Sequence, residues 1–352
     1  MAGKWKTAVL AVAIGGAGVV IFAVLSGLLY EQTQRARDRQ RYPQVGRSVD
    51  IGGRMLNIDC AGAGQPAVIL ESGANWSISR GVYDPRTMWA NGGPRPGYSW
   101  MPVQRALAAV TTVCWYDRAG SGWSDLGPYP RDSASQARDL HALLHAGGLA
   151  PPYLLAGESS AALDVRVYAS LFPSEVAGLV LANWADPAIF LDRRSNNGKR
   201  ADRVPEVVYH GQDTMAQLFN MVGYFRLGHP PPAPAPPRGL TDAEWRTIWH
   251  LTHSSKAMSA LLQDIAAWRQ SSAEARAGGS LGAIPLVVLG ADNLAEPAEF
   301  REAWSNAQSQ LARLSTRGKQ MVGGNGASDL LYDAPGTIVE AVRQVLAGAR
   351  MK

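Results

Sequence analysis

Ser159 lies in a stretch whose residue types are typical of a catalytic nucleophile. The apolar run YLLA (153–156) leads into GESSA (157–161), and a helical pattern begins directly after it. This matches the nucleophile elbow G-x-S-x-G with its last glycine changed to alanine, since the tight turn needs small residues around the serine. Such a serine attacks acyl carbon atoms, and the backbone N–H of Ser160 at the helix start could stabilise the resulting oxyanion. The alternative is an ordinary strand–helix turn rich in small residues.

A serine hydroxyl is a poor nucleophile at neutral pH unless a base takes its proton. Residues 319–342, KQMVGGNGASDLLYDAPGTIVEAV, read as a short strand, a glycine-rich loop and a helix that begins with proline. Many serine hydrolases carry their histidine base in a loop of this kind. Here the loop holds Asn325, Gly326, Ala327, Ser328 and Asp329. The sequence therefore offers a nucleophile without a histidine at the usual place.

Two further turns with small or charged residues also follow apolar runs and precede the elbow in the chain. Glu71-Ser72-Gly73 follows VIL, and DRAGSG (117–122) follows TTVCWY. Together with the elbow, these turns resemble the α/β-hydrolase superfamily. More narrowly, the chain resembles a bacterial branch of membrane-anchored α/β hydrolases, through the motifs RYP…G…VD.GG, VGYFRLG, LTDAEW, IPLVVL, LARLSTRG and YDAPGTIVEAV. The resemblance covers essentially the whole chain.

The resemblance implies an α/β-hydrolase fold: a mostly parallel sheet with helices on both faces, a helical cap insertion and one N-terminal transmembrane helix. Ser159 matches the nucleophile. Ser72 and Gly73 match the oxyanion loop, and Ser160 supplies the second donor.

The departures from the family pattern concern the base and the acid. Counting back seven residues from Pro335, the family's histidine position holds Ser328. The family's aspartate after strand six is replaced by Asn183, and Glu158 stands before the nucleophile where histidine is common. Of the three triad positions only Ser159 is retained. Disabling one triad member costs roughly four to six orders of magnitude in turnover.

A substitute base would have to come from elsewhere in the chain. His250 and His253 lie one turn apart on an expected cap helix, which places them on one face. Glu158 and Glu71 are the carboxylate candidates, if burial raises their pKa values. The alternative is that these histidines belong to an ordinary amphipathic helix and that both carboxylates bind the turn backbone. A histidine pair alone lacks the further ligands that zinc needs, so we expect no metal site and no cofactor.

The elements expected to position these residues alternate between strands and helices. PAVILES, TTVCWYD, PYLLAG, AGLVLAN and IPLVVLG are continuous apolar runs, typical of strands buried on both faces. SVDIGGRMLNIDC predicts a hairpin around Gly52-Gly53. SASQARDLHALLHAGG and GTIVEAVRQVLAG each predict a helix with one apolar face. This alternation favours a mostly parallel sheet covered on both sides.

The region 187–282 lacks strand patterns and breaks the alternation. It contains the proline-rich HPPPAPAPPRG, and Thr241 and Glu244 are spaced as a capping box that opens a helix. We therefore divide the chain into an N-terminal transmembrane anchor (1–30), a basic juxtamembrane linker (31–47), a first core part (48–186), a helical cap (187–282) and a second core part (283–352).

Residues 7–30 are uncharged and long enough to cross a bilayer, which needs roughly 20 apolar residues. A cleaved signal peptide has a shorter apolar core and a small-residue cleavage site, so we favour an uncleaved single-pass membrane anchor. Basic residues flank both ends, and the side of the soluble domain stays open. We expect a short helix in the linker after the anchor.

The charge distribution and the cysteine content exclude two classes of protein. The net charge of +5 is concentrated in residues 35–47 rather than on a basic face with aromatics, so we expect no nucleic-acid binding. Two cysteines, Cys60 and Cys114, rule out a disulfide-dense scaffold. They are either buried thiols or, because the fold family places their strands side by side, a disulfide formed in an oxidising compartment.

Three functions remain. The first is a pseudo-hydrolase that acts as a binding or structural subunit in a membrane assembly, with other subunits and the bilayer as partners. The second is a carboxylic-ester-type serine hydrolase with a non-standard base. The third is a receptor for a small apolar acyl ligand. Whether the protein is an enzyme depends on what lies beside the Ser159 hydroxyl.

Overall fold

An eight-stranded sheet forms the centre of the computed structural model, which describes residues 2–74, 93–184, 218–224, 226, 232–291, 298–324, 326 and 329–351. Its strand order is β1-β2-β4-β3-β5-β6-β7-β8. The strands are β1 (Arg47–Asp50), β2 (Met55–Ala61), β3 (Ala67–Ser72), β4 (Val113–Tyr116), β5 (Tyr153–Glu158), β6 (Val176–Ala182), β7 (Leu286–Ala291) and β8 (Gly318–Gly323). β2 is antiparallel to β1 and β4, and all other neighbouring strands are parallel. The predicted hairpin and mostly parallel sheet are confirmed.

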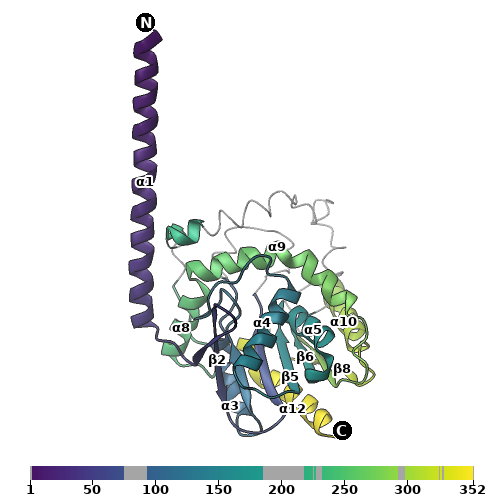
Figure 1. Ribbon diagram of the computed structural model, residues 1–352. Helices are drawn as coiled ribbons and strands as arrows, with labels where there is room; N and C mark the ends of the chain where they lie inside the picture. Colours follow the sequence, from purple (N-terminus) through teal and green to yellow (C-terminus); the bar gives the residue numbers. More distant parts are fainter. Residues whose placement is uncertain are drawn as a thin grey trace.

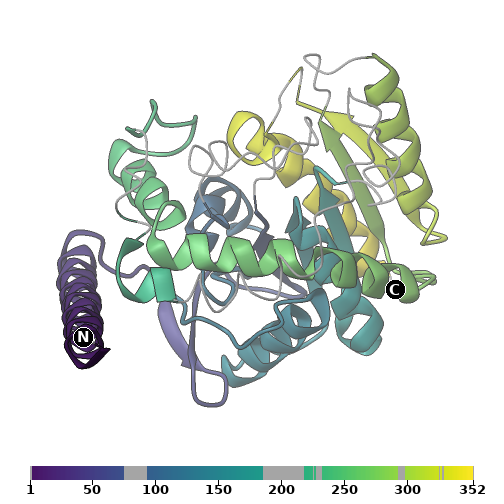
Figure 2. The ribbon, with the colours of Figure 1, turned by 90° about the horizontal axis from the view of Figure 1, so that it is seen from above.

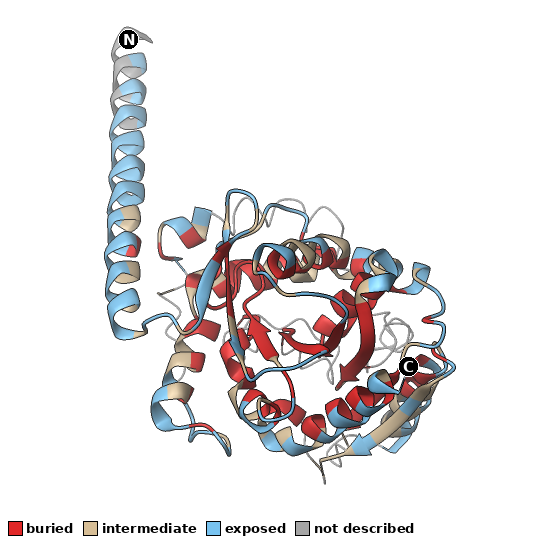
Figure 3. Cartoon of the chain, turned by 60° about the horizontal axis from the view of Figure 1, so that its bottom comes forward, coloured by how far each residue is buried: buried red, intermediate tan, exposed pale blue. Residues whose placement is uncertain are grey.

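The apolar runs form strands because both faces of the sheet are covered. In β3, Ile69 belongs to one buried cluster, whereas its neighbours Val68 and Leu70 belong to the other, as the alternation of a strand requires. The first cluster includes residues of helices α4 (Ser133–Ala146), α5 (Ala161–Leu171) and α10 (Ala298–Ala312). The second includes residues of α3 (Met101–Leu107) and α12 (Pro335–Arg350). Figure 3 shows the buried sheet between these layers.

Among the described residues of the region expected to form a cap, α8 (Asp242–Thr252) and α9 (Ser255–Ala277) are the long helices. Helix α8 begins at the predicted capping box, in which Thr241 accepts from the Glu244 N–H and the Glu244 side chain accepts from the Thr241 N–H. Helix α9 packs on α4 and α5. It crosses the top of the core in Figure 1 and runs across the molecule in Figure 2.

Helix α1 (Ala2–Arg41) extends away from the core as a single 40-residue helix (Figure 1). The expected linker helix is thus continuous with the apolar stretch up to Arg41. From residue 13 the helix is long and apolar enough to cross a membrane by length and composition, with none of its most apolar window buried against the protein. Such a helix is either an anchor or a signal sequence.

Cys60 and Cys114 occupy directly opposed positions on β2 and β4. Their Cα atoms are 4.1 Å apart and the structure joins the pair in a disulfide. The bond ties the antiparallel strand β2 to the parallel part of the sheet.

Candidate active site

The elbow is built as the sequence suggested. β5 ends at Glu158, α5 starts at Ala161, and between them Ser159 has a φ of 56°, in the left-handed region that favours glycine. Only glycine fits at position 157, because a Cβ there would lie 2.5 Å from the Ala161 carbonyl oxygen. The Ser159 N–H donates to the Ala182 carbonyl at 2.9 Å, which ties the strained turn to the end of β6.

Ser159 is 8% exposed, and the proton of its hydroxyl is already engaged in a hydrogen bond. Oγ donates to the Ala74 carbonyl oxygen at 2.8 Å. A backbone carbonyl accepts a hydrogen bond but cannot take the proton in a reaction. The hydroxyl is therefore held by an acceptor that does not activate it.

The expected oxyanion loop is docked tightly on the elbow. The Gly73 N–H donates to the Glu158 carbonyl at 3.0 Å, and the Ala74 N–H donates to Ser160 Oγ, also at 3.0 Å. A Cβ at Gly73 would lie 2.6 Å from the Ser160 nitrogen, so only glycine allows this approach. Ser72 is buried at the end of β3. The structure thus brings the predicted loop to Ser160, with the Gly73 amide engaged in backbone hydrogen bonding.

Arg95 lies between Glu158 and Asp329, the residue that follows the position where the family carries its histidine. These three residues form the base side of the site. Its guanidinium is buried and bridges two carboxylates, with Nη1 3.1 Å from Glu158 Oε2 and Nη2 in a short contact with Asp329. The Tyr332 ring lies 4.8 Å from Arg95 Cζ, and the Tyr332 hydroxyl donates to Ser99 Oγ. Glu158 directly precedes the nucleophile, whereas Asp329 directly follows Ser328. The ion pairs therefore join the two segments that would flank a serine–histidine pair.

Burial and neighbouring charges set the protonation of this cluster. Burial raises the pKa of Glu158 to about 7, against the opposing effects of Arg95 and of a hydrogen bond from the Asn183 side chain. The pKa of Arg95 is raised above its ordinary value, because the attraction of Asp329 and Glu158 outweighs the cost of burial. Glu158 has the pKa of a general base or acid, but the partners found for its carboxylate are Arg95 and Asn183.

Of the two positions where the family carries its acid and its base, the structure describes the first, Asn183, but not the second, Ser328. Asn183 directly follows β6 with a φ of 53°, and its N–H donates to the Leu289 carbonyl at 2.7 Å. Its side chain lies beside Glu158 and therefore belongs to the Arg95 cluster. Ser328 lies outside the described residues. Its neighbour Asp329 caps the short helix α11 (Leu330–Asp333) by accepting from the N–H groups of Leu331 and Tyr332.

The two histidine candidates face other partners. His250 stacks on Tyr42 with ring centroids 4.1 Å apart and lies 3.6 Å from Asp38, so it faces the end of α1. His253 Nδ1 lies 2.8 Å from the Trp249 carbonyl oxygen, and its ring packs against Trp249. In the part of the chain that the structure describes, the Ser159 hydroxyl is hydrogen-bonded to Ala74 rather than to either imidazole.

Glu71 belongs to a second buried cluster, on the α5 and α9 side of the sheet. Arg118 bridges Asp164 at 3.0 Å and Asp264 at 2.7 Å, which fastens the turn after β4 to α5 and α9. Burial and the neighbouring Asp164 raise the pKa of Glu71 well above its ordinary value. Burial also raises the pKa of Asp164 to about 6. The Ser159 hydroxyl donates to the Ala74 carbonyl rather than to the Glu71 carboxyl.

Among the described residues, one group has donor atoms that could hold a metal ion: His141, His145 and Glu175. Both imidazole Nε2 atoms lie near the same Glu175 oxygen, at 3.3 and 2.9 Å. Tyr168 donates to the other Glu175 oxygen at 2.6 Å. The group lies on α4 and the turn before β6, in the outer layer, and contributes nothing to the elbow. Hydrogen bonds within the group already satisfy its carboxylate.

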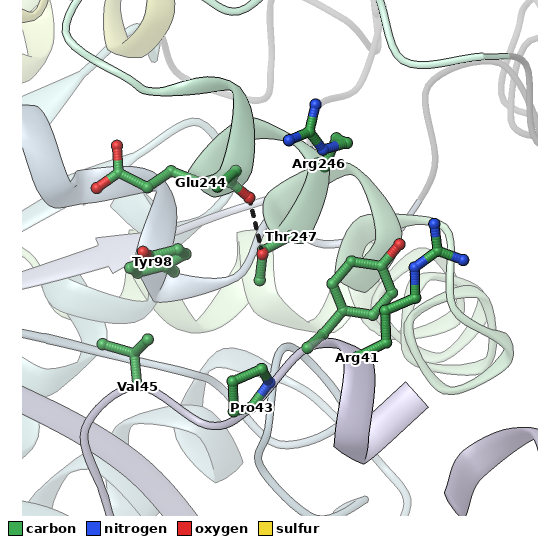
Figure 4. Close-up of a pocket in the computed structure, with 9 residues that line it drawn as sticks. Arg41, Pro43, Val45, Tyr98, Glu244, Arg246 and Thr247 are labelled. Atoms are coloured by element: carbon green, nitrogen blue, oxygen red, sulfur yellow. Dashed lines mark hydrogen bonds between the residues drawn. The ribbon is translucent and has the colours of Figure 1, made fainter. Parts of the chain in front are cut away.

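A pocket of about 390 Å³ lies between the end of α1 and helix α8. Figure 4 shows that its walls come from the chain around Arg41 and Val45, the start of α8 and Tyr98. The lining includes none of the residues found to contact Ser159 or Arg95. The pocket is thus a feature of the junction between α1 and the domain.

The sheet order, the strained serine at the turn from β5 to α5 and the docked loop after β3 together define an α/β-hydrolase architecture. Residues 90–293, more than half of the chain, match the family model described as alpha/beta hydrolase fold. The chain belongs to this family.

Individual relatives are distant. YbdG of Bacillus subtilis (strain 168), an uncharacterized protein, is 23% identical over 211 residues, which cover 60% of this chain and 57% of YbdG. The chain thus matches less than two thirds of the length of that relative. Among solved structures, a serine hydrolase involved in carbazole degradation (CarC enzyme) aligns with a TM-score of 0.55 and 16% identity over 86% of this chain and 98% of that one. The epoxide hydrolase CorEH gives the same TM-score, identity and coverage. These likenesses concern the fold.

Sequence reasoning missed Arg95 as a site residue. It lies between two prolines and outside every motif that carried the resemblance. Its carboxylate partners are 63 and 234 positions away, so no local pattern could have indicated the pairing. The sequence indicated Asp329 only as a residue of the loop that contains Ser328, the family's histidine position.

Proposed function

We propose that the protein is a membrane-anchored pseudo-hydrolase, an α/β-hydrolase scaffold that serves as a binding or structural subunit and does not turn over acyl substrates. The observation that carries this proposal is the Arg95 cluster beside a serine whose hydroxyl donates to a backbone carbonyl. A triad enzyme needs an imidazole at this side of the serine. Here a buried guanidinium links the flanking segments instead, and the two carboxylates neutralise its charge.

Anchorage through residues 7–30 is part of the proposal. Helix α1 is exposed, apolar and long enough to span a bilayer, and the chain lacks a cleavage motif of the A-x-A type at the end of its apolar run. The Cys60–Cys114 disulfide favours a soluble domain on the oxidising side. The arginines after the span do not oppose this strongly, because long domains translocate largely regardless of flanking charge. Alkylation of both cysteines without prior reduction would overturn the assignment of the membrane side.

A fluorophosphonate probe tests the loss of turnover. We expect no covalent adduct on Ser159 when the full-length protein, purified in mild detergent, is treated with millimolar probe and analysed by intact mass. An active serine hydrolase in the same tube serves as the positive control. Rapid labelling that disappears in Ser159→Ala would contradict the proposal. The same detergent preparation shows whether other subunits copurify in fixed stoichiometry.

One observation favours a second candidate, an ester hydrolase with Glu158 as its base. A carboxyl with a pKa of about 7 is suited to proton transfer at neutral pH. If Ser159 is labelled, Glu158→Gln separates the candidates, since the amide keeps the shape but cannot take a proton. Loss of labelling in that variant would assign Glu158 as the base. A receptor for an apolar acyl ligand, the third candidate, predicts a bound lipid in the purified protein without any adduct.

A further inference from the structure

Helix α1 is fastened to the domain near the point where its apolar stretch ends. Glu31 is only 2% exposed, although most described residues of α1 are exposed. It accepts hydrogen bonds from Arg35, one helical turn further along α1, and from Arg226, which lies within the range expected to form the cap (187–282). Arg226 also pairs with Asp38 at 2.8 Å. These charged contacts hold the segment around residues 218–226 against one side of α1, as Figure 1 shows for its short helical turn.

A backbone contact places the same segment one turn further into the apolar stretch. A Cβ added at Gly27 would lie 2.8 Å from the Val222 carbonyl oxygen and 2.9 Å from Val222 Cβ. Only glycine at position 27 therefore lets residue 222 come so close to α1. Gly27 belongs to the uncharged run 7–30, so Val222 lies at the level of that run and not beyond its end.

The length of the run sets the depth of this contact in a bilayer. At 1.5 Å per residue the run measures roughly 36 Å, and the hydrocarbon core of a bilayer is about 30 Å thick. The last turn of the run, which includes Gly27 and Tyr30, therefore lies at the boundary between acyl chains and headgroups. Glu31 and its arginine partners follow directly in the headgroup layer. Val222 is held at the same boundary.

The surface of this segment fits that environment. Leu218, Met221 and Tyr224 are 49%, 51% and 48% exposed, although they are large and apolar. The Tyr224 ring stacks on Phe219 with centroids 4.5 Å apart. Apolar side chains with an aromatic hydroxyl are typical of the membrane interface, and an apolar surface of this kind indicates a partner.

We infer that Leu218, Met221 and Tyr224, the interfacial patch, insert into the headgroup–acyl boundary of the bilayer beside α1. The inference rests on the proposed anchorage of α1. A single spanning helix can tilt and rotate in the bilayer, and the domain fastened to it moves with it. The patch adds a second contact with lipid to one side of the helix, so the face of the domain that carries residues 218–226 is held towards the membrane. The partner of this surface is the lipid bilayer itself.

Single cysteines in the full-length chain test the inference, because both native cysteines are bonded to each other. Met221→Cys and Leu218→Cys carry an environment-sensitive nitrobenzoxadiazole dye in phosphatidylcholine nanodiscs that contain a lipid with a nitroxide near its headgroup. Val110→Cys is the matched control, since Val110 is also exposed and lies beside Arg350 near the C-terminus, away from α1. Leu25→Cys reports on the span. The wild-type chain must take no dye.

We expect blue-shifted emission and at least twofold stronger nitroxide quenching at positions 218 and 221 than at 110. Quenching at 25, combined with values at 218 and 221 equal to those at 110, would overturn the inference and leave the anchor intact. Blue-shifted emission at 218 and 221 without quenching by the lipid nitroxide would indicate a protein partner and would also overturn it. Absence of quenching at 25 would refute the anchor instead.

Discussion

The two sides of the site differ in the interactions that hold their residues in place. The nucleophile side comprises Gly73, Gly157 and Ser159, and the base side comprises Arg95, Glu158 and Asp329. On the nucleophile side, a strained Ser159, a glycine two positions earlier and a loop docked through Gly73 preserve the family geometry. On the base side, Arg95 joins Glu158 to Asp329 by buried ion pairs. The first side is defined by backbone and the second by individual side chains.

This difference indicates which parts of a catalytic site the fold itself retains. The elbow connects β5 to α5, and its N–H bonds to the end of β6, so the core needs the turn whether or not the serine reacts. A histidine and its acid serve only chemistry. Under the proposed loss of both residues, the buried carboxylate of Glu158 still needs a partner, because an isolated buried charge is costly. Arg95 supplies that partner, and the base side becomes a structural link between the elbow and the C-terminal loop.

The largest expected effect follows from removal of that link. Arg95→Met leaves Glu158 and Asp329 without their shared cation, and breaking a buried ion pair in this way costs roughly 3–5 kcal/mol. The matched control is Arg105→Met, which breaks the Arg105–Glu244 pair, in which the arginine side chain is 47% exposed. An exposed pair contributes roughly 0–1 kcal/mol. Urea unfolding in detergent, followed by tryptophan fluorescence, gives both free energies of unfolding.

Two further results sharpen this test. The cost of Arg95→Met should shrink at about pH 5, because Glu158 then becomes neutral and no longer needs the guanidinium. If the Arg95 and Arg105 variants lose equal stability at neutral pH, the base side is not a structural link and the comparison fails.

The next effect is a pH dependence that originates at Glu158. Its pKa in the folded protein is about 7, raised by burial from the ordinary 4.5. The folded chain therefore binds this proton more tightly than the unfolded chain. The resulting stabilisation is complete below pH 4.5 and is lost as the pH rises through 7. The pKa rises by about 2.5, so at about 1.4 kcal/mol per pKa unit the loss amounts to at most about 3.5 kcal/mol.

Glu158→Gln isolates this contribution. We expect the free energy of unfolding of the wild type to fall between pH 5 and 8, and that of the variant to fall less. Asp164→Asn, in the Arg118 cluster, should flatten the curve in the same direction but by less, since the pKa of Asp164 is raised only to about 6. A Glu158→Gln curve with the slope of the wild type would show that this carboxyl does not titrate with folding.

The same contrast explains how much the sequence could predict. The strands, the hairpin, the capping box at Thr241 and the elbow were predictable, because each depends on residues close together in the chain. The Arg95 cluster was not, since its members come from three distant segments. The extension of α1 to Arg41 was underestimated, although neither proline nor glycine interrupts residues 28–41. Ser328, which the family alignment singled out, lies outside the described residues, and its role stays a prediction.

The smallest expected effect concerns the strain kept on the nucleophile side. Ser159→Ala and Ser159→Gly both remove the hydrogen bond to Ala74, so the difference between them isolates the backbone. The left-handed conformation costs an L-residue roughly 1–2 kcal/mol, whereas glycine adopts it freely but loses more entropy on folding. We therefore expect Ser159→Gly to exceed Ser159→Ala in stability by about 0.5–1 kcal/mol in urea unfolding. An alanine variant as stable as the glycine variant would mean that the turn has relaxed. The nucleophile side would then no longer hold its serine in the family's geometry, and the two sides of the site would have diverged equally from catalysis.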